Sequence, residues 1–552
     1  MLPIPSRMRP HRRPHHRSHR ASRRALAVAG LTATGLALLT ACAPGSPGGG
    51  GGGGGGGSNT LVIGMTASDI PLLDTGLCQN QGYEGVRFVG NQLYDGLTKF
   101  DLKQGSEIPK VIPGLATSWT PNADGTVWTF KLREGVTFHD GEKWNADAAM
   151  FGLNRYLNKS APEFYPTLNA QAGLTIAGIK SAAKVDDMTI SITTDGPLSY
   201  LPANLTTVFF GSPKAIKELG NDGFAQKPVG TGPFKFESIT RGQQLVLVKN
   251  ESYWGGAPKV DKVVMRPIPD ATARVAALRS GQVNWIEVPP PDDVPTLTAD
   301  GFQVVTNSYD HVWPWVFDVR KKPWDDVRVR QAANYAINRE ALVTNVLKGT
   351  ADPALQVAAK ANAAFRTENE LYSYDPEKAK KLLAEAGYPN GFETRLSFPT
   401  SGSGNMIPIP MNEALQADLA AVGIKVKLEP VEWASMLTDF FVGKIPGGAD
   451  TINISLSMQQ EGFWNTWFGT GSGSNVGGYS NPKVDALLTQ AKQELDGDKR
   501  SDLYAAASKL LTEDAAWLLV VNDRNPRALA KNVTGFVQPK SWFADLTTLS
   551  VG

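Results

Sequence analysis

Cysteine and histidine are scarce in this 552-residue chain, which has two cysteines and six histidines. Four of the histidines lie before residue 20. A structural zinc site needs about four nitrogen or sulfur ligands, so we expect no metal site and no cofactor. If Cys42 is modified, Cys78 has no disulfide partner, and we expect it to be a small buried apolar residue. Stability must then come from the burial of apolar side chains.

Acidic residues are absent from the first 41 positions, whereas eight arginines lie at residues 7–24. Apolar and small residues fill positions 25–41, directly before Cys42. This order is typical of a signal peptide, and the apolar run is shorter than the roughly 20 residues that cross a bilayer. The arginine pair Arg23-Arg24 also fits a twin-arginine signal, so export by the Sec or the twin-arginine route stays open. Both routes lead out of the cytoplasm.

The four residues Leu39-Thr40-Ala41-Cys42 resemble the lipobox of bacterial lipoproteins. The resemblance implies that residues 1–41 are removed and that Cys42 carries lipid, which would hold the protein at a membrane surface. Ten consecutive glycines follow, from Gly48 to Gly57, and glycine-rich chains are flexible. We therefore predict that residues 42–58 tether a folded body to the extracytoplasmic face of the cell membrane.

Positive charge is not in excess once the first 41 residues are set aside. Of the 55 Lys and Arg residues eight are lost and of the 53 Asp and Glu none, which leaves 47 against 53. The remaining chain has no polybasic patch, so nucleic acid is not expected as a partner. The roughly 490 residues after the glycine run are too many for one hydrophobic core and enough for two or three.

Strand patterns dominate the first half of the chain and helix patterns the second. Short apolar or alternating runs predict strands at 60–66, 126–132, 188–193 and 243–248. Capping residues, apolar spacing and terminal glycines predict helices from Asp325 to Gly349, from Asp375 to Gly387, and near 410–422, 482–495 and 498–513. A strand at 424–428 follows the third helix at once, and this alternation indicates an α/β fold.

Several sequence motifs occur in a fixed order along the chain. They are Pro113-Gly-Leu-Ala-Thr-Ser-Trp119, Gly135-Val-Thr-Phe-His-Asp-Gly141, Pro228-Val-Gly-Thr-Gly-Pro-Phe-Lys-Phe236, Asn250-Glu-Ser-Tyr-Trp254, Tyr335-Ala-Ile-Asn-Arg339, and others at 323–332, 374–383 and 479–485. Together they resemble family 5 of the extracellular solute-binding proteins, which serve ABC importers and include dipeptide, oligopeptide and nickel binding proteins. Their order and spacing extend the resemblance over residues 60–545. Independently of it, Gly230 and Gly232 indicate a place where the chain bends sharply.

The resemblance implies a two-lobed periplasmic-binding-protein fold of type II-like α/β architecture, with hinge strands between the lobes and an extra subdomain in the first lobe. The expected boundaries are lobe I core at 59–95, 229–305 and 525–552, extra subdomain at 96–228, and lobe II at 306–524. A ligand would lie between the lobes, and closure would present the protein to ABC permease subunits. We expect a monomer.

Enzyme motifs are weak in this chain. Ser181 and Lys184 match the Ser-x-x-Lys of penicillin-binding enzymes, but no Ser-Asp-Asn or Lys-Thr-Gly accompanies them. His139-Asp140 lies in a glycine-flanked turn, where an aspartate bonding its own backbone is the simpler interpretation. We therefore predict a binding protein that catalyses no reaction.

The resemblance also locates candidate ligand residues. Peptide-binding members hold the ligand ammonium with an aspartate in a region that corresponds here to residues 455–467, which contain no aspartate; Glu461 is the only acid. Amide and aromatic side chains there would suit a neutral polar ligand. The predicted ligand-binding residues are Thr66, Ala67, Ser68, Trp433, Ser457, Gln459, Gln460, Glu461 and Trp464.

Three interpretations of the ligand and role stay open. An oligopeptide is the first choice, because most members of the family carry peptides. A neutral oligosaccharide or another polar metabolite is the alternative, and nickel is disfavoured because only His139 and His311 follow the leader. A surface sensor for a signalling peptide would need the same fold.

Overall fold

The computed structural model of the protein describes residues 59–552. The predicted signal peptide, Cys42 and the glycine tether lie outside the described residues. The described residues belong to one compact unit. Within residues 59–552, no helix combines the length and the apolar character that a bilayer crossing requires.

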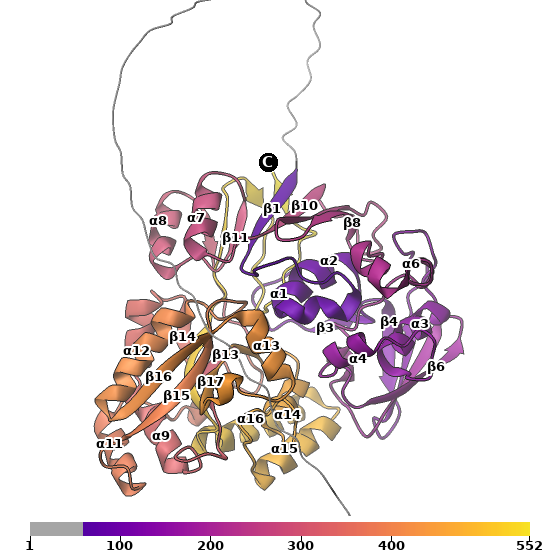
Figure 1. The fold of residues 1–552 in the computed structure, drawn as a ribbon. Coiled ribbons are helices and arrows are strands. Elements are labelled where there is room, and N and C mark those ends of the chain that lie inside the picture. Colours follow the sequence, from indigo (N-terminus) through magenta and orange to yellow (C-terminus); the bar gives the residue numbers. More distant parts are fainter. Residues whose placement is uncertain (1–58) are drawn as a thin grey trace, which may run out of the picture. The chain divides into compact units, whose positions relative to one another are not determined.

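The first sheet has seven strands, and we call the part of the protein built on it lobe I (Figure 1). The strand order is β12 (Gln303–Val305), β20 (Arg527–Leu529), β11 (Trp285–Glu287), β1 (Thr60–Met65), β10 (Lys262–Pro267), β9 (Gln244–Lys249) and β8 (Phe234–Thr240). Strand β1 lies in the middle and pairs in parallel with β10 and β11. The predicted strands at 60–66 and 243–248 are confirmed.

A separate four-stranded sheet forms the extra subdomain, shown in purple tones in Figure 1. Its order is β4 (Ala116–Pro121), β5 (Val127–Leu132), β7 (Thr189–Thr194) and β6 (Ile179–Asp186), with helix α3 (Ala146–Leu157) packed on it. Strands β5 and β7 confirm the predicted runs at 126–132 and 188–193. The subdomain has its own hydrophobic core, in which Phe130, Ile190 and Ile192 are fully buried.

The third sheet carries the second half of the chain, and we call this part lobe II. Its order is β14 (Ala351–Pro353), β19 (Trp517–Asp523), β13 (His311–Phe317), β17 (Thr451–Asn453), β15 (Phe392–Pro399) and β16 (Ile424–Val431), and β18 (Leu456–Ser457) pairs with β13. Its helices include α9 (Val327–Ala336), α11 (Pro376–Glu385), α12 (Pro408–Ala421), α15 (Pro482–Gln493) and α16 (Gly497–Glu513). Four of the five predicted helices are confirmed over most of their length.

The predicted helix from Asp325 to Gly349 is interrupted. Helix α9 ends at Ala336, and Asn338 then adopts a non-helical backbone while its side chain accepts a hydrogen bond from Ala341 N at 2.9 Å. Asn338 therefore caps a new helical segment, α10 (Arg339–Ala341). Asparagine side chains form hydrogen bonds with nearby backbone groups, and asparagine is therefore favoured at a helix cap over a helix interior. The apolar spacing alone does not reveal such a cap, so it predicted too long a helix.

The two glycines of the Gly230-Thr231-Gly232 bend are required by a close approach of two backbone segments. A Cβ at Gly230 would lie 2.0 Å from Leu93 O, and one at Gly232 would lie 2.5 Å from Leu93 C. Gly232 N also donates to Leu93 O at 3.0 Å. Neither glycine has a positive φ. Glycine is therefore needed at both positions because it has no side chain, and not because of its conformational freedom.

A buried ion triad fixes the C-terminal part of lobe I. Glu287 lies between Arg87, at 2.6 Å, and Arg527, at 3.0 Å, and all three side chains are about 1 % exposed or less. Burial alone would raise the pKa of Glu287, but the two arginine charges outweigh it and lower that pKa. The triad lies next to a chain crossing, because β19 of lobe II continues through residues 524–526 into β20 of lobe I.

Candidate ligand cleft

A cavity of about 660 Å³ lies where lobe I, the extra subdomain and lobe II meet. Lobe I contributes Gln79, Gly82, Tyr83, Val86 and Trp542, and the extra subdomain contributes Leu174 and Thr175. Lobe II contributes Ser403, Trp433, Leu437, Phe440, Phe441, Ile454, Ser455, Leu456, Ser457, Phe463 and Trp467. Since every part of the fold supplies a wall, the cavity depends on how the lobes are held together.

Aromatic rings from both lobes meet at this cavity. Tyr83 of lobe I stacks on Trp542 with ring centroids 5.2 Å apart, and it meets Phe463 of lobe II edge-on at 6.3 Å. Phe463 in turn packs against Trp467 at 5.4 Å, and Trp467 lies 5.7 Å from Phe440. Such pairs combine large apolar areas with a preferred geometry, and together these rings form an aromatic wall of the cavity.

Helix α13 (Trp433–Phe441) supplies several of the side chains that line the cavity from lobe II. Glu432 caps it by accepting a hydrogen bond from Ser435 N at 2.9 Å. Trp433, Leu437 and Phe440 are spaced by four and three residues, so they lie on one face of the helix. All three are buried and line the cavity. Phe441, which is 40 % exposed, lies at the mouth.

The cavity walls carry no ionisable acid, lysine, arginine or histidine among the described residues. They do carry polar atoms that lack a partner within residues 59–552: Trp433 Nε1 and Ser403 Oγ. A buried donor without a partner costs free energy unless a ligand or water satisfies it. The cavity is therefore suited to an uncharged, largely apolar group that presents a hydrogen-bond acceptor.

Two of the predicted ligand residues line this cavity, namely Trp433 and Ser457. Gln459 and Gln460 instead join the lobes at its edge. Gln459 Oε1 accepts a hydrogen bond from Ser541 Oγ of lobe I at 2.8 Å. The other glutamine donates from Nε2 to Thr207 Oγ1 of the extra subdomain at 3.2 Å. These amides help to hold the lobes in the arrangement that closes the cavity.

Glu461 and Trp464 take part in packing within lobe II. Glu461 Oε2 accepts a hydrogen bond from Arg500 Nε at 2.6 Å, so its charge already has a partner. Trp464 is 1 % exposed and stacks on Tyr504 with centroids 5.4 Å apart. Neither residue lines the cavity.

The three predicted residues after β1 lie on another side of lobe I. Thr66 donates from its backbone N and from Oγ1 to the Glu84 carboxylate, at 2.7 and 2.8 Å. It also lines a wider opening of about 840 Å³, which residues 400–402 and 406–410 of lobe II close from the other side. Ala67 is buried and Ser68 is exposed.

The sequence reasoning did not single out most of the aromatic wall. Phe463 and Trp467 lie in the predicted stretch 455–467, and their spacing of four residues matches one helix face. Tyr83 and Trp542 are 459 positions apart, and no local pattern links them to each other or to lobe II. Only the tertiary fold brings them together.

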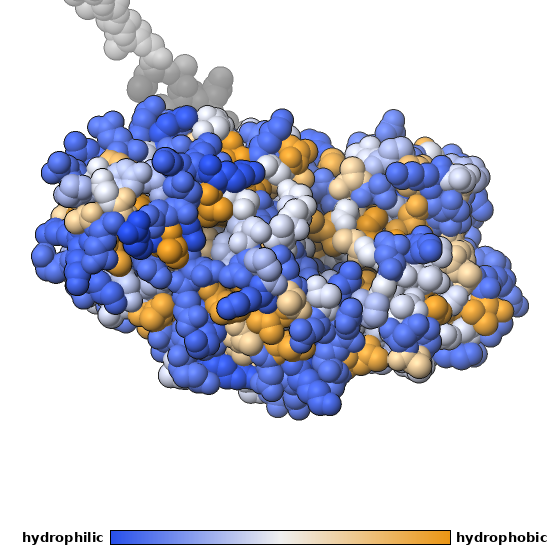
Figure 2. Space-filling view, turned by 90° about the horizontal axis from the view of Figure 1, so that it is seen from below, coloured by the Kyte–Doolittle hydropathy of each residue, from blue (hydrophilic) through white to orange (hydrophobic). Residues whose placement is uncertain are grey.

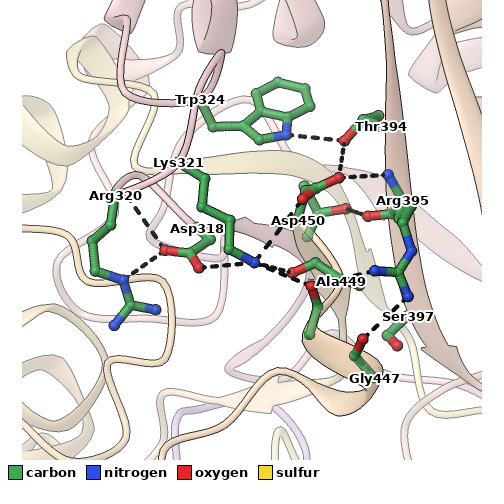
Figure 3. Close-up of polar contacts among 12 residues, drawn as sticks. Asp318, Arg320, Lys321, Trp324, Thr394, Arg395, Ser397, Gly447, Ala449 and Asp450 are labelled. Atoms are coloured by element: carbon green, nitrogen blue, oxygen red, sulfur yellow. Dashed lines mark hydrogen bonds and ion pairs between the residues drawn. The ribbon is translucent and has the colours of Figure 1, made fainter.

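A polar cluster in lobe II, shown in Figure 3, has a structural role. Lys321 Nζ donates to Gly448 O and Ala449 O, at 3.1 and 3.0 Å, and lies 3.5 Å from Asp318. Asp450 Oδ2 accepts from Arg395 N at 2.9 Å. The cluster therefore satisfies its own charges and offers nothing to a ligand. Within residues 59–552, no group of three or more His, Cys, Asp or Glu is placed to hold a metal ion.

The outer surface shows no large apolar area on the face drawn in Figure 2. Hydrophilic residues cover most of this face, and hydrophobic residues form separate small patches. Isolated exposed apolar residues are normal for soluble proteins.

The chain matches the model of a known protein family. The model is that of the bacterial extracellular solute-binding proteins, family 5, and the match covers residues 110–476. The heme-binding protein A of Haemophilus influenzae is 32 % identical over 469 residues, which are 81 % of this chain and 84 % of that protein. The glutathione-binding protein GsiB of Pectobacterium atrosepticum is 32 % identical over 481 residues, 83 % and 89 % of the two chains.

Solved structures share the fold. The periplasmic binding protein DppA of Helicobacter pylori, solved in complex with the peptide STSA, superimposes with a TM-score of 0.77 at 27 % identity. The alignment covers 89 % of this chain and 98 % of that chain. The predicted two-lobed fold is thereby confirmed.

Proposed function

Because the chain belongs to family 5 of the bacterial extracellular solute-binding proteins, we propose that it is the receptor of an ABC importer and takes a peptide. The peptide lies between the lobes with an aromatic or aliphatic side chain in the cavity, and the receptor catalyses no reaction. The observation that carries the proposal is the cavity itself, which is walled by both lobes and the extra subdomain and has no charged side chain. Lipid on Cys42 keeps the receptor beside the permease.

The chemistry of the walls selects the ligand group. An ionised side chain in this cavity would lose its hydration without gaining a partner, which costs several kcal/mol. An apolar side chain gains about 25 cal/mol for each Å² removed from water. The free Trp433 Nε1 donor is available to a peptide carbonyl. Glu461 is occupied by Arg500, so we assign it no role in holding the ligand ammonium.

A set of tripeptides that differ only in the central residue tests the proposal. We expect Ala-Phe-Ala and Ala-Leu-Ala to raise the unfolding temperature of the purified protein, and Ala-Lys-Ala and Ala-Asp-Ala to have little effect. A ligand at 100 times its dissociation constant adds about 2.7 kcal/mol to stability, which is readily seen. Trp433→Ala should remove the shift. Trp119→Ala, a half-buried tryptophan of the extra subdomain, should leave it unchanged.

A neutral oligosaccharide is the second candidate ligand. Sugars pack on flat aromatic faces, and their hydroxyls would accept from Trp433 Nε1 and bond with Ser403 Oγ, which have no partner among the described residues. Gluco- and xylo-oligosaccharides therefore belong in the same unfolding assay. Stabilisation by sugars and by none of the peptides would reject the peptide proposal, and stabilisation by Ala-Lys-Ala equal to that by Ala-Phe-Ala would reject the assignment of the cavity.

A further inference from the structure

Lobe I contains a second cavity, of about 720 Å³, that is separate from the cleft. Its walls come from helix α2 (Asn91–Leu93), strand β2 (Thr98–Phe100), the turn around Tyr253 and the C-terminal segment 543–547. No residue of lobe II lines it. Opening or closing of the lobes therefore leaves its walls in place. We call it the rear cavity.

The rear cavity has an apolar wall. Phe100 and Phe543 stack with ring centroids 6.2 Å apart, and Leu102, Phe209 and Leu546 complete this side. Phe543 also lies 5.5 Å from Tyr83, whose ring borders the cleft. A molecule in the rear cavity would thus rest on the far side of the aromatic wall of the cleft.

Two lysines, Lys99 and Lys103, also line the rear cavity and lack ion-pair partners among the described residues. Within residues 59–552, neither Lys99 nor Lys103 has a carboxylate oxygen within 4.0 Å. Lys99 Nζ lies 4.7 Å from the ring centre of Trp254, and the Arg133 guanidinium lies 4.3 Å from the same ring. Burial lowers the pKa of Lys99, so an anion beside it would regain part of the lost solvation.

The acids of the rear cavity are engaged by donors of the protein itself. Asp95 is buried and accepts hydrogen bonds from Thr231 Oγ1, Tyr253 OH and Trp254 Nε1, at 2.8, 2.9 and 3.0 Å. Asp545 Oδ1 accepts from the backbone N and Oγ1 of Thr547, at 2.8 and 2.5 Å. Both oxygens of Asp95 are thus engaged, whereas only Oδ1 of Asp545 is. The ammonium groups of Lys99 and Lys103 make no hydrogen bond or ion pair within residues 59–552, so they can still bind an anion.

A buried amide oxygen of the rear cavity lacks a hydrogen-bond donor among the described residues. The Gln92 side chain lines the rear cavity and is 2 % exposed. Its Nε2 donates to Arg87 O at 2.8 Å, whereas its Oε1 has no partner among the described residues. Buried acceptors of this kind are normally satisfied, so Gln92 Oε1 can still accept a hydrogen bond from a ligand in the rear cavity.

We propose that the rear cavity is a second ligand site for a small organic anion, with its carboxylate or phosphate on Lys99 and Lys103 and its apolar body against Phe100 and Phe543. A hydroxyl or amino group on the ligand would donate to Gln92 Oε1. The site is independent of the peptide cleft and of the identity of the cleft ligand.

Calorimetric titration of the purified protein tests this site. The probes are 3-phenylpropionate, phenyl phosphate and the neutral 3-phenylpropionamide. We expect one or both anions to bind about tenfold or more tightly than the amide, because a charged hydrogen bond contributes at least that factor. Affinity should also fall as salt rises. The better anion identifies whether carboxylate or phosphate is preferred.

Variants separate the rear cavity from the cleft. The double variant Lys99→Gln with Lys103→Gln should lose about tenfold or more in affinity for the anion. Lys110→Gln, an exposed lysine of the neighbouring strand connection, and Trp433→Ala in the cleft should bind as the parent protein does. Circular dichroism and the unfolding midpoint show whether each variant is folded.

Four results would overturn the proposal. These are equal binding of anion and amide, unchanged affinity in a folded double lysine variant, loss of binding in Trp433→Ala, and no binding of either anion at millimolar concentration. The last result leaves the peptide cleft unaffected, and a failure of the tripeptide assay leaves the rear cavity unaffected.

Discussion

Replacing Asp523 by asparagine should change how the stability of this protein depends on pH. Asp523 is the last residue of β19, directly before the chain crosses from lobe II to lobe I. Its carboxylate is 1 % exposed and accepts hydrogen bonds from Tyr309 OH and Asn525 N, both at 2.8 Å. Burial raises the pKa of Asp523 from the ordinary 3.8 to about 7, although these two bonds act in the opposite direction.

The sign of the effect follows from proton binding. Between pH 4 and 7 the folded protein keeps the Asp523 proton and the unfolded chain has lost it, so raising the pH favours unfolding. The stabilising contribution is complete below about pH 4 and is lost by about pH 7. A shift of about 3 pKa units corresponds to a free energy on the order of 4 kcal/mol.

Asparagine preserves the shape of the side chain and removes the titration. Its Oδ1 can still accept from Asn525 N, and its amide can donate to the Tyr309 oxygen. The measurement is the free energy of unfolding of both proteins in urea at pH 4.5, 5.5, 6.5 and 7.5. We expect Asp523→Asn to gain stability relative to the parent by up to about 1.4 kcal/mol per pH unit between pH 4.5 and 6.5, and the difference to level off above about pH 7.

Comparison of the two proteins at each pH cancels the other groups that titrate in the window. His311 is one such group, since burial lowers its pKa in the folded protein from the ordinary 6.5 to about 3, so that only the unfolded chain takes up this proton in the window. Asp222→Asn, a change at an exposed aspartate of the extra subdomain, is the control and should give a constant difference. A constant difference for Asp523→Asn as well would refute the reasoning.

Three further predictions concern stability and reactivity. Glu287→Gln should destabilise the protein by about 3–5 kcal/mol in urea unfolding, because the two buried arginines beside it lose their counter-charge; a loss below 1 kcal/mol would contradict the triad. Gly230→Ala should prevent soluble folding, since its Cβ would meet Leu93 O, whereas Gly196→Ala, with no atom within 4 Å, should express and melt normally. Cys78 should resist thiol reagents in the native protein and react after denaturation, as read by peptide mass spectrometry, because it is fully buried and burial raises the pKa of its thiol.

Local patterns in the sequence predicted the elements well. The strand at 60–66 and the helix opened by Asp375-Pro376 follow from apolar runs and capping residues, whose effects extend over a few neighbours. The break after α9 was not predicted, because the apolar spacing continues past Asn338 and predicts an unbroken helix, whereas Asn338 acts as a cap. Family motifs predicted the two-lobed fold, which the comparisons confirm.

The cleft could be predicted only in part. Trp433 was found because aromatic residues stand out in lobe II, and stretch 455–467 was found because family motifs mark its position. Trp464, three positions before Trp467 on the same short helix, packs into the core on Tyr504 instead. The orientation of this helix about its own axis decides whether Trp464 or Trp467 faces the cavity. Amino-acid composition does not predict that orientation.

By itself, the sequence determined the family of this protein and most of its strands and helices, because each depends on residues close together in the chain or on ordered motifs. The export and lipid signals stay predictions. The tertiary structure alone decided that Tyr83, Trp542 and Trp467 share one uncharged cavity, and that Lys99 and Lys103 line another together with Phe543. These groups come from distant segments, and a cavity's charge and shape arise only when the segments pack together.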